Sequence, residues 1–350
     1  MFNSIGFVDK VLLTKHLSIM IKNGIPIIEA LYSIADQSTN PKMKALLLTI
    51  AKDIANGKSF QHAIAKHPDI FDPLYISLIS VGETSGSLES NLDYLAVYLR
   101  KQYEFKKKVK GALMYPIIVI SAATLVGGFA SFYVLPKLID LFESLDVKLP
   151  LSTRILLWIA YFVRDYNIFI VIAVAGIIFL WKFLLSRPNV RYIYEKVIFK
   201  LPVFGLFSQN IQLTFFCRNL GIMLKSGISI TLALQTQYQA TTNLIYKEYV
   251  GKLQKSVDKG KSLYTELSNG SYTYIPKITT KMIGVGEETG NLDESLLYLA
   301  DFFEDEVDTT TKNFATILEP FLLIVIGAIV GFVAFSIISP IYGLVGNIHQ

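Results

Sequence analysis

Residues that build most catalytic and metal sites are scarce in this chain. Its 350 residues include one cysteine and four histidines, and no two histidines have the spacing of a metal-binding pair. A single cysteine excludes an internal disulfide. No Ser/His/Asp arrangement is apparent. The sequence therefore predicts neither catalysis nor a metal or cofactor, and we expect Cys217, beside Phe216, to be a small buried apolar residue.

Charge is also scarce. Only 17% of the residues are charged, 52% are hydrophobic and the mean hydropathy is +0.45, which is too apolar for an ordinary soluble protein. The first ten residues lack a basic stretch followed by an apolar one, so no cleavable signal peptide is expected. A membrane-spanning helix needs about 20 mostly apolar residues. Three stretches are long and apolar enough to be predicted as such helices, at 115–135, 167–186 and 317–339.

The second predicted span is the least regular. Lys182 lies inside it and would extend to the membrane surface. The apolar run Ile155–Val163 precedes it, and Arg164 and Asp165 separate the two. We expect Ile155–Val163 to be an interfacial helix or an early part of the span.

The apolar stretches belong to a sequence that occurs twice. Many residues between Leu17 and Ser59 recur at an offset of 203, and many between Val81 and Pro136 recur at an offset of 204. A one-residue insertion in the second copy accounts for the change. Such internal similarity is a primary guide to architecture. It predicts that a soluble module followed by a membrane span has been duplicated.

The basic residues predict the orientation. Lys and Arg are concentrated before the first span and after the second, whereas the tail 340–350 contains neither. Since cytoplasmic flanks carry the Lys/Arg excess, the modules 1–114 and 187–316 are predicted to be cytoplasmic. The segment 136–166 and the tail would be external. Two copies on one side require an even number of crossings between them, in agreement with three spans, a cytoplasmic N-terminus and an external C-terminus.

Both modules have the periodicity of helices. Apolar residues recur at helical spacing, as at Leu92, Leu95 and Leu99, and no run alternates in the manner of a strand. Breaks at glycines divide each module into about six helices. We therefore predict an all-α membrane protein with two homologous helical bundles and three transmembrane helices.

The helices that lead into the first and third spans differ in charge. We call the first the basic stem and the second the acidic stem. The basic stem contains Arg100, Lys101, Lys106, Lys107, Lys108 and Lys110, and the acidic stem contains Asp301, Glu304, Asp305, Glu306 and Asp308. Each stem is either a solvated helix face or a surface that selects a partner or pairs across subunits.

Duplicated glycines mark the breaks between helices. The residues of interest in the first two breaks are Gly24, Pro26, Gly57, Gly227 and Gly260. The third break is a Gly-Glu-x-x-Gly element, formed by Gly82, Glu83 and Gly86 before Leu88, and by Gly286, Glu287 and Gly290 before Leu292. Its glycines permit left-handed backbone or close helix approach. We expect each glutamate to lie in a tight turn. There it either accepts backbone N–H groups from the first turn of the next helix or forms a partner or ion site.

Two further features need interpretation. Gly57-Lys58-Ser59 resembles part of a phosphate-binding loop, but Lys52 stands where that motif requires glycine, so nucleotide binding is not predicted. Glu319 precedes Pro320 at the start of the third span, as Tyr115 precedes Pro116 at the first. Glu319 is either an interfacial, partly hydrated group or a buried polar contact to another transmembrane helix.

These motifs together resemble the GspF/PilC family. The resemblance rests on both copies of the Gly-Ile, Gly-Lys-Ser and Gly-Glu-x-x-Gly elements and on Ala-Leu-Met-Tyr-Pro and Ile-Leu-Glu-Pro-Phe at two spans. It covers nearly the whole chain. The departures are Ser229 in place of Pro26 and Leu263 in place of Phe60, and both concern the detailed geometry of the second bundle.

The resemblance implies a non-enzymatic, oligomeric platform protein of the inner membrane in a type IV pilus or type II secretion machine. Its expected partners are a hexameric assembly or secretion ATPase, pilin or pseudopilin transmembrane helices, other inner-membrane assembly proteins and the lipid bilayer. No nucleic-acid contact is expected. Glu83, Glu287 and the surfaces around Gly24 and Gly227 are candidates for ATPase or self-contacts, and Glu319, Pro116 and Pro320 for pilin contacts.

A different class remains as an alternative. Secondary transporters are often internally duplicated as well. Three spans without a charge at mid-membrane, attached to larger soluble modules, disfavour this alternative. The sequence leaves pilus assembly, protein secretion and DNA uptake open.

Overall fold

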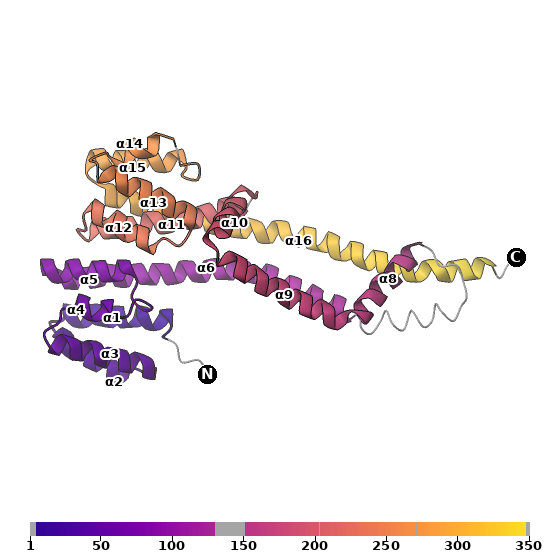
Figure 1. Ribbon diagram of the computed structural model, residues 1–350, viewed down its shortest axis with the longest axis horizontal. Coiled ribbons are helices and arrows are strands. Elements are labelled where there is room, and N and C mark those ends of the chain that lie inside the picture. The colour runs from indigo at the N-terminus through magenta and orange to yellow at the C-terminus, as the bar shows by residue number, and fades with distance from the viewer. Residues whose placement is uncertain (1–4, 130–150, 203, 271, 348–350) are drawn as a thin grey trace. The chain divides into compact units, whose positions relative to one another are not determined.

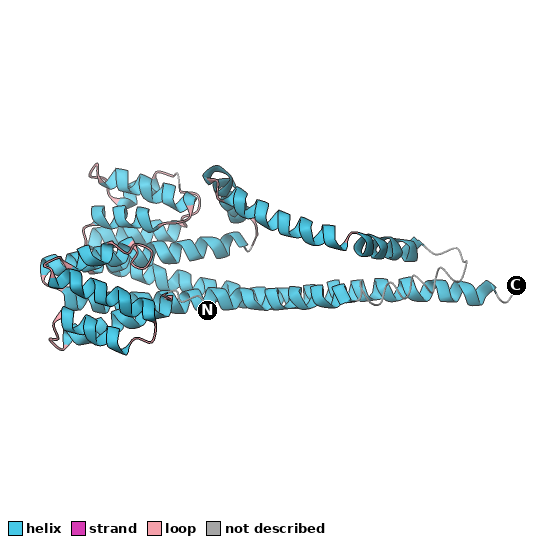
Figure 2. Cartoon of the chain, turned by 60° about the horizontal axis from the view of Figure 1, so that its bottom comes forward, coloured by secondary structure: helices cyan, strands magenta, loops and turns pink. Residues whose placement is uncertain are grey.

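The computed structural model describes residues 5–129, 151–202, 204–270 and 272–347. Every regular element within these ranges is a helix, and none of the described residues forms a strand (Figure 2). The predicted all-α class is thereby confirmed for the described part of the chain. Figure 1 gives the helix labels used below.

The first copy of the repeat forms six of the described helices. They are α1 (Phe7–Lys22), α2 (Ile27–Gln37), α3 (Pro41–Ala55), α4 (Phe60–Ala65), α5 (Pro73–Ser85) and α6 (Leu88–Phe129). The second copy forms α11 (Phe204–Lys225), α12 (Ile230–Ala240), α13 (Leu244–Val257), α14 (Leu263–Ser268), α15 (Lys277–Thr289) and α16 (Leu292–Asn347). Helix α10 (Pro188–Lys200) precedes the second copy.

The helix bounds repeat almost residue for residue. Both ends of α12 and α14 lie 203 residues after those of α2 and α4, and both ends of α15 lie 204 residues after those of α5. The inserted residue therefore belongs to the connection 269–276 between α14 and α15. That connection has eight residues where the first copy has seven, 66–72. A surface connection accommodates an added residue without a shift in helix packing.

Side chains that cap helix N-termini explain why the bounds repeat. Asn40 accepts the Lys42 N–H at the start of α3, and Asn243 accepts the Tyr246 N–H at the start of α13. Pro26 and its counterpart Ser229 both immediately precede their helices. Proline fixes its backbone angle near the value a helix start needs, whereas serine can accept an N–H of the first turn, so either residue starts the helix at the same position.

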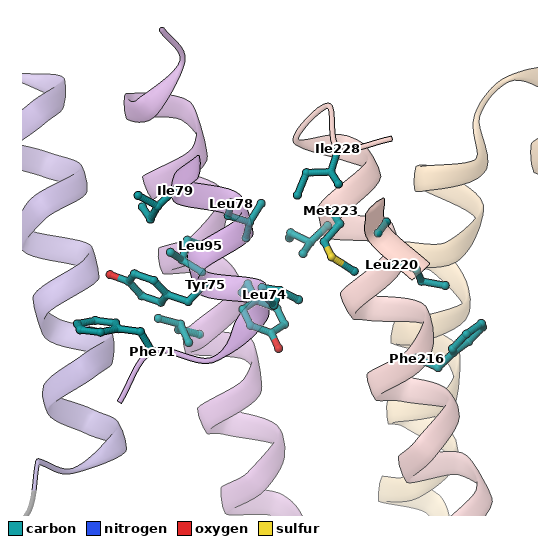
Figure 3. Packing of buried hydrophobic residues seen from close by; sticks show 14 of the residues in the cluster. Phe71, Leu74, Tyr75, Leu78, Ile79, Leu95, Phe216, Leu220, Met223 and Ile228 are labelled. Carbon is teal, nitrogen blue, oxygen red and sulfur yellow. The ribbon is translucent and has the colours of Figure 1, made fainter. Parts of the chain in front are cut away.

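Both copies contribute to one hydrophobic core. Residues 1–109 and 192–309 form one compact unit, in which α5 contacts α11 and α12. Figure 3 shows Leu74 and Leu78 of α5 on the side that faces Met223 of α11. All three side chains are buried, Leu74 at 1% exposure and the other two completely.

Residues 110–191 and 310–350 form the second unit. Its described helices include α8 (Leu151–Asp165) and α9 (Asn167–Leu185), which are separated at Tyr166. Thr153 Oγ1 donates a 2.7 Å hydrogen bond to the Ser336 carbonyl of α16. The apolar run that precedes the second predicted span is thus part of a separate helix, α8.

One described helix, α9, is long and apolar enough to cross a membrane, with a mean hydropathy of 2.7 over Ile168–Leu185. The runs Ile117–Phe129 and Leu323–Ser336 are apolar but shorter. Positions 130–135 of the first predicted span and 136–150 of the predicted external segment lie outside the described residues, as do 348–350 of the tail.

Candidate functional site

The Glu83 carboxylate clamps the start of a short helix. Glu83 lies near the end of α5, and its two oxygens accept the backbone N–H groups of Phe60 and Gln61 at 2.6 and 2.7 Å. These residues open α4, where the first N–H groups have no partner within the helix. A carboxylate satisfies these donors and interacts favourably with the positive end of the helix dipole.

The second copy contains the same clamp. Glu287 of α15 accepts the N–H groups of Leu263 and Tyr264 at the start of α14, at 2.7 and 2.8 Å. Ser59 and Ser262 add a cap at each of these helix starts. A six-residue helix is too short to be stable alone, so it depends on such contacts and on packing.

The expected turn geometry was partly wrong. Glu83 and Glu287 lie in the last turns of α5 and α15 rather than in tight turns. Each carboxylate binds the start of the helix that precedes its own, not of the helix that follows. The reason is that α5 and α15 continue to Ser85 and Thr289, while the start of α4 or α14 lies beside their last turn.

The glycine next to each clamp permits close helix packing. A Cβ atom on Gly82 would lie 2.9 Å from the Leu88 Cα, and one on Gly286 would lie 2.9 Å from the Leu292 Cα. Leu88 and Leu292 are the first residues of α6 and α16, as predicted. Gly86 and Gly290 end α5 and α15 with φ of 70° and 76°, in the left-handed region that glycine adopts readily.

The remaining duplicated glycines also have left-handed backbone. They are Gly24, Gly57, Gly227 and Gly260, with φ between 78° and 84°. The side chains of Lys58 and Ser59, which follow Gly57, bind groups of the same chain. Lys58 pairs with Asp53 at 2.7 Å, Lys66 pairs with the other oxygen of Asp53, and Ser59 caps α4. Hydrogen bonds from Lys58 and Lys66 lower the pKa of Asp53 to about 2.

The basic and acidic stems pair with each other within one chain. Lys101 reaches Asp301 at 2.8 Å, and Lys108 reaches Glu304 at 2.9 Å and Asp308 at 3.0 Å. These five residues therefore do not form a purely solvated face, and within the chain each stem is the partner of the other. Burial would raise the pKa of Asp301, but the hydrogen bond from Lys101 and the nearby positive charges lower it below its ordinary value.

Arg218 of α11 is the most buried member of this charge cluster. Only 4% of its side chain is exposed, and its guanidinium contacts Asp301 at 2.9 Å and Glu304 at 2.7 Å. Removing one partner from a buried ion pair strands the other charge in the protein interior. Arg218 is not among the residues predicted from the sequence. The available signal was a charged residue within the apolar run from Phe215 to Met223.

A cleft of about 380 Å³ lies between the two copies and is lined by both polar and apolar residues. At its wall Gln102 donates to the Tyr98 hydroxyl at 3.0 Å, and Tyr98 donates to Asn219 Oδ1 at 2.9 Å. The side-chain oxygens of Gln102 and Gln237 also line this region, are buried and have no hydrogen-bond partner among the described residues. The sequence repeat contains a signal for this cleft, because Gln237 stands where the first copy has the apolar Ile34.

The other predicted positions are less informative. Cys217 is completely buried, as expected, and burial raises the pKa of its thiol. Among the described residues, no group of His, Cys, Asp or Glu could hold a metal ion. Pro116 lies in α6, and Glu319 and Pro320 lie in α16. The side chains of Pro116 and Glu319 are outside the described part of the structure.

Comparison with known proteins identifies the family. The family model described as type II secretion system (T2SS), protein F, matches residues 13–136 and 216–340. The type IV pilus assembly protein PilC of Pseudomonas aeruginosa is 31% identical over 97% of this chain and 90% of its own length. The PilC protein of Thermus thermophilus is 30% identical over 98% of this chain and 84% of its own length.

A relative from a secretion machine has similar coverage. The type II secretion system protein F of Vibrio cholerae is 27% identical over 95% of this chain and 82% of its own length. The two matched segments correspond to the two copies of the repeat, and the resemblance inferred from the motifs is confirmed. The chain belongs to the type II secretion system protein F family.

Proposed function

We propose that this protein is the inner-membrane platform of a type IV pilus or type II secretion machine. In this role it couples a cytoplasmic assembly ATPase to the insertion of pilin or pseudopilin subunits. Family membership and relatives from both kinds of machine support the proposal. One structural observation carries it: the last helix of each copy continues from the core of the first unit into an apolar run.

Helix α6 illustrates this continuity. Its Leu95, Leu99 and Phe105 are completely buried, and the same helix includes the apolar run Ile117–Phe129. In the second copy α16 has Phe303 and Val307 in the interior and includes Leu323–Ser336. A continuous run of backbone hydrogen bonds makes a helix resist bending, and the first prolines of α6 and α16, Pro116 and Pro320, lie beyond the stems. A displacement of either helix by the ATPase would therefore be transmitted into the membrane.

The proposed topology has three spans, at 115–135, 167–186 and 317–339. The N-terminus would be cytoplasmic and the C-terminus external. The length and hydropathy of α9 support the second span, and the Lys/Arg excess beside the spans supports the orientation. Within this topology, the clamps and the exposed loops at Gly24 and Gly227 would contact the ATPase or other copies. Glu319, Pro116 and Pro320 would contact pilin helices.

An insertion into α6 tests the coupling. Seven residues of Gly-Ser sequence placed after Lys110 would interrupt the helix, whereas seven residues of an Ala-Glu-Lys sequence would extend it by about two turns and keep its phase. We expect the Gly-Ser variant to abolish piliation or secretion and the helical variant to retain part of it. Both should enter the membrane normally.

Normal assembly in the Gly-Ser variant would contradict the coupling mechanism. Counting surface pili and measuring an exported substrate in the same strain identifies which machine the protein serves. Labelling of engineered cysteines from either side of the membrane checks the topology, and finding the two copies on opposite sides would overturn the proposal.

A further inference from the structure

Equivalent helices of the two copies differ in which of their surfaces are buried. In α11 of the second copy, Ile222 is 7% exposed and Asn219 binds Tyr98 of the first copy. Phe215, on the same helix, packs against Phe105 with ring centroids 5.4 Å apart. These residues form the side of α11 that lies at the contact between the copies.

The equivalent side of α1 is uncovered. The residues 203 positions earlier than Phe215, Asn219 and Ile222 are Leu12, His16 and Ile19. All three are exposed, Leu12 at 51% and Ile19 at 45%. We call the surface formed by Leu12, His16, Ile19 and Ile25 the α1 face. A surface that is buried or half-buried in the second copy is thus exposed in the first.

The opposite side of the contact shows the same asymmetry. The first copy buries Leu74 of α5 and Tyr98 of α6, at 1% and 3% exposure. Their counterparts 204 positions later, Ile278 of α15 and Phe302 of α16, are 50% and 40% exposed. Val285 and Tyr298 on the same two helices are exposed as well. We call the surface formed by Ile278, Val285, Tyr298 and Phe302 the α15/α16 face.

The contact between the copies is therefore heterologous. In a two-fold arrangement the same surfaces would meet on both copies, and the α1 face and the α15/α16 face would both be buried. Instead, α5 and α6 of the first copy meet α11 and α12 of the second. One complementary surface remains exposed on each copy. Large exposed apolar surfaces of this kind mark interaction sites.

We infer that the α15/α16 face of one chain packs on the α1 face of a second copy of the same chain. The contact within the chain is the template, since it joins the equivalent surfaces. The charges of two exposed residues at these surfaces agree with this arrangement. Pro73 and Gln239 line the same cleft between the copies, and their counterparts are Lys277 and Asp36. An exposed lysine would thus meet an exposed carboxylate, which within its own chain pairs with Lys44 at 3.4 Å.

Membrane insertion restricts the resulting assembly. This step rests on the proposed function, because it requires all chains to have the same orientation in the bilayer. Chains so oriented are related by a rotation about an axis perpendicular to the membrane or by a shift within its plane. A repeated head-to-tail contact then closes into a ring if the rotation divides a full turn, and otherwise continues as an open row.

A cysteine pair tests the contact directly. Within the chain, the Ser77 and Thr236 hydroxyl oxygens lie 3.1 Å apart. Their counterparts in the proposed contact are Lys281 of one chain and Ser33 of the next. Lys281 is exposed and Ser33 is partly exposed, so both positions tolerate cysteine. Oxidation of the Ser33→Cys/Lys281→Cys full-length protein in isolated membranes should give a ladder of disulfide-linked dimers, trimers and larger species.

The single variants give the decisive comparison. Neither Ser33→Cys nor Lys281→Cys alone should form a dimer, whereas co-expression of the two with different tags should give mixed dimers only. Cys217 is completely buried and contributes no background. The Ser77→Cys/Thr236→Cys variant should form its disulfide within one chain and serves as the positive control. Dimers of a single variant, or no ladder when the positive control is oxidised, would overturn the proposal.

Substitutions in the face provide a second readout. Phe302→Asp in the cysteine-pair protein should remove the ladder. Leu48→Asp, at an exposed apolar residue of α3 outside both faces, should leave it unchanged. An unchanged ladder with Phe302→Asp would also overturn the proposal. The ladder is scored in membranes without reference to pili or secretion, so its absence would leave the proposed function standing.

Discussion

The clamp at Glu287 allows a quantitative prediction. Its carboxylate binds two backbone N–H groups at the start of α14, and the neighbouring Glu288 is exposed. Glu287→Ala removes both acceptors. Glu287→Gln keeps one acceptor oxygen but presents an NH₂ group to the second N–H. Glu288→Gln makes the same chemical change one residue away and is the matched control.

The two hydrogen bonds differ in the free energy that their loss would cost. Leu263 is buried, so its N–H would lose its partner without access to water, at a cost of about 1–3 kcal/mol. Tyr264 is 42% exposed, and water can replace the carboxylate at its N–H, for a net loss of about 0.5–1.5 kcal/mol. We expect Glu287→Ala to lower the free energy of local opening of α14 by about 3 kcal/mol in sum, and Glu287→Gln by about half of this.

Hydrogen exchange measures this opening. Each 1.4 kcal/mol changes an equilibrium constant about tenfold, so amides of α14 should exchange about a hundredfold faster in Glu287→Ala and about tenfold faster in Glu287→Gln. The measurement is made by mass spectrometry on the full chain in lipid nanodiscs, on peptides that cover Leu263–Ser268. Glu288→Gln should match the parent protein. Unchanged exchange in Glu287→Ala would refute the clamp.

Two further predictions concern packing and pH. Gly286→Ala should lower the melting temperature in a thermal unfolding scan, because the new Cβ would lie 2.9 Å from the Leu292 Cα and overpacking costs about 1–3 kcal/mol. Gly111→Ala, with no atom within 4 Å of the added Cβ, should not lower it. Asp53→Asn should destabilise α3 and α4 above about pH 4, the ordinary pKa of aspartate. Because the folded pKa of Asp53 is lowered to about 2, the stability it contributes is lost as the pH falls toward 2, where variant and parent should converge in hydrogen exchange.

The sequence predicts local structure well because the repeat and the caps are local signals. The glycine breaks and the capping residues set the helix bounds in both copies, and the duplicated Gly-Glu elements were recognised as helix ends. The exchange of Pro26 for Ser229 leaves those bounds unchanged, since both residues suit a helix start.

Contacts between distant segments were not predictable in the same way. The helix that accepts the Glu83 carboxylate depends on which helix start lies beside α5 in space. The partners of Asp301 depend on how the two copies meet, because Lys101 comes from the other copy and Arg218 from another helix. Asn219 and Gln237 are buried for the same reason, because the two copies meet at these residues. A single sequence contains no spacing that reports such packing.

The shared core of the two copies has a thermodynamic consequence. Because one covalent chain carries both, the contact of α5 with α11 and α12 forms at an effective concentration set by the tether rather than by cellular abundance. Dilution that would separate independently synthesised halves leaves this contact intact. Each half can then diverge as long as it fits the half to which it is covalently linked, as Lys101 and Asp301 fit one another.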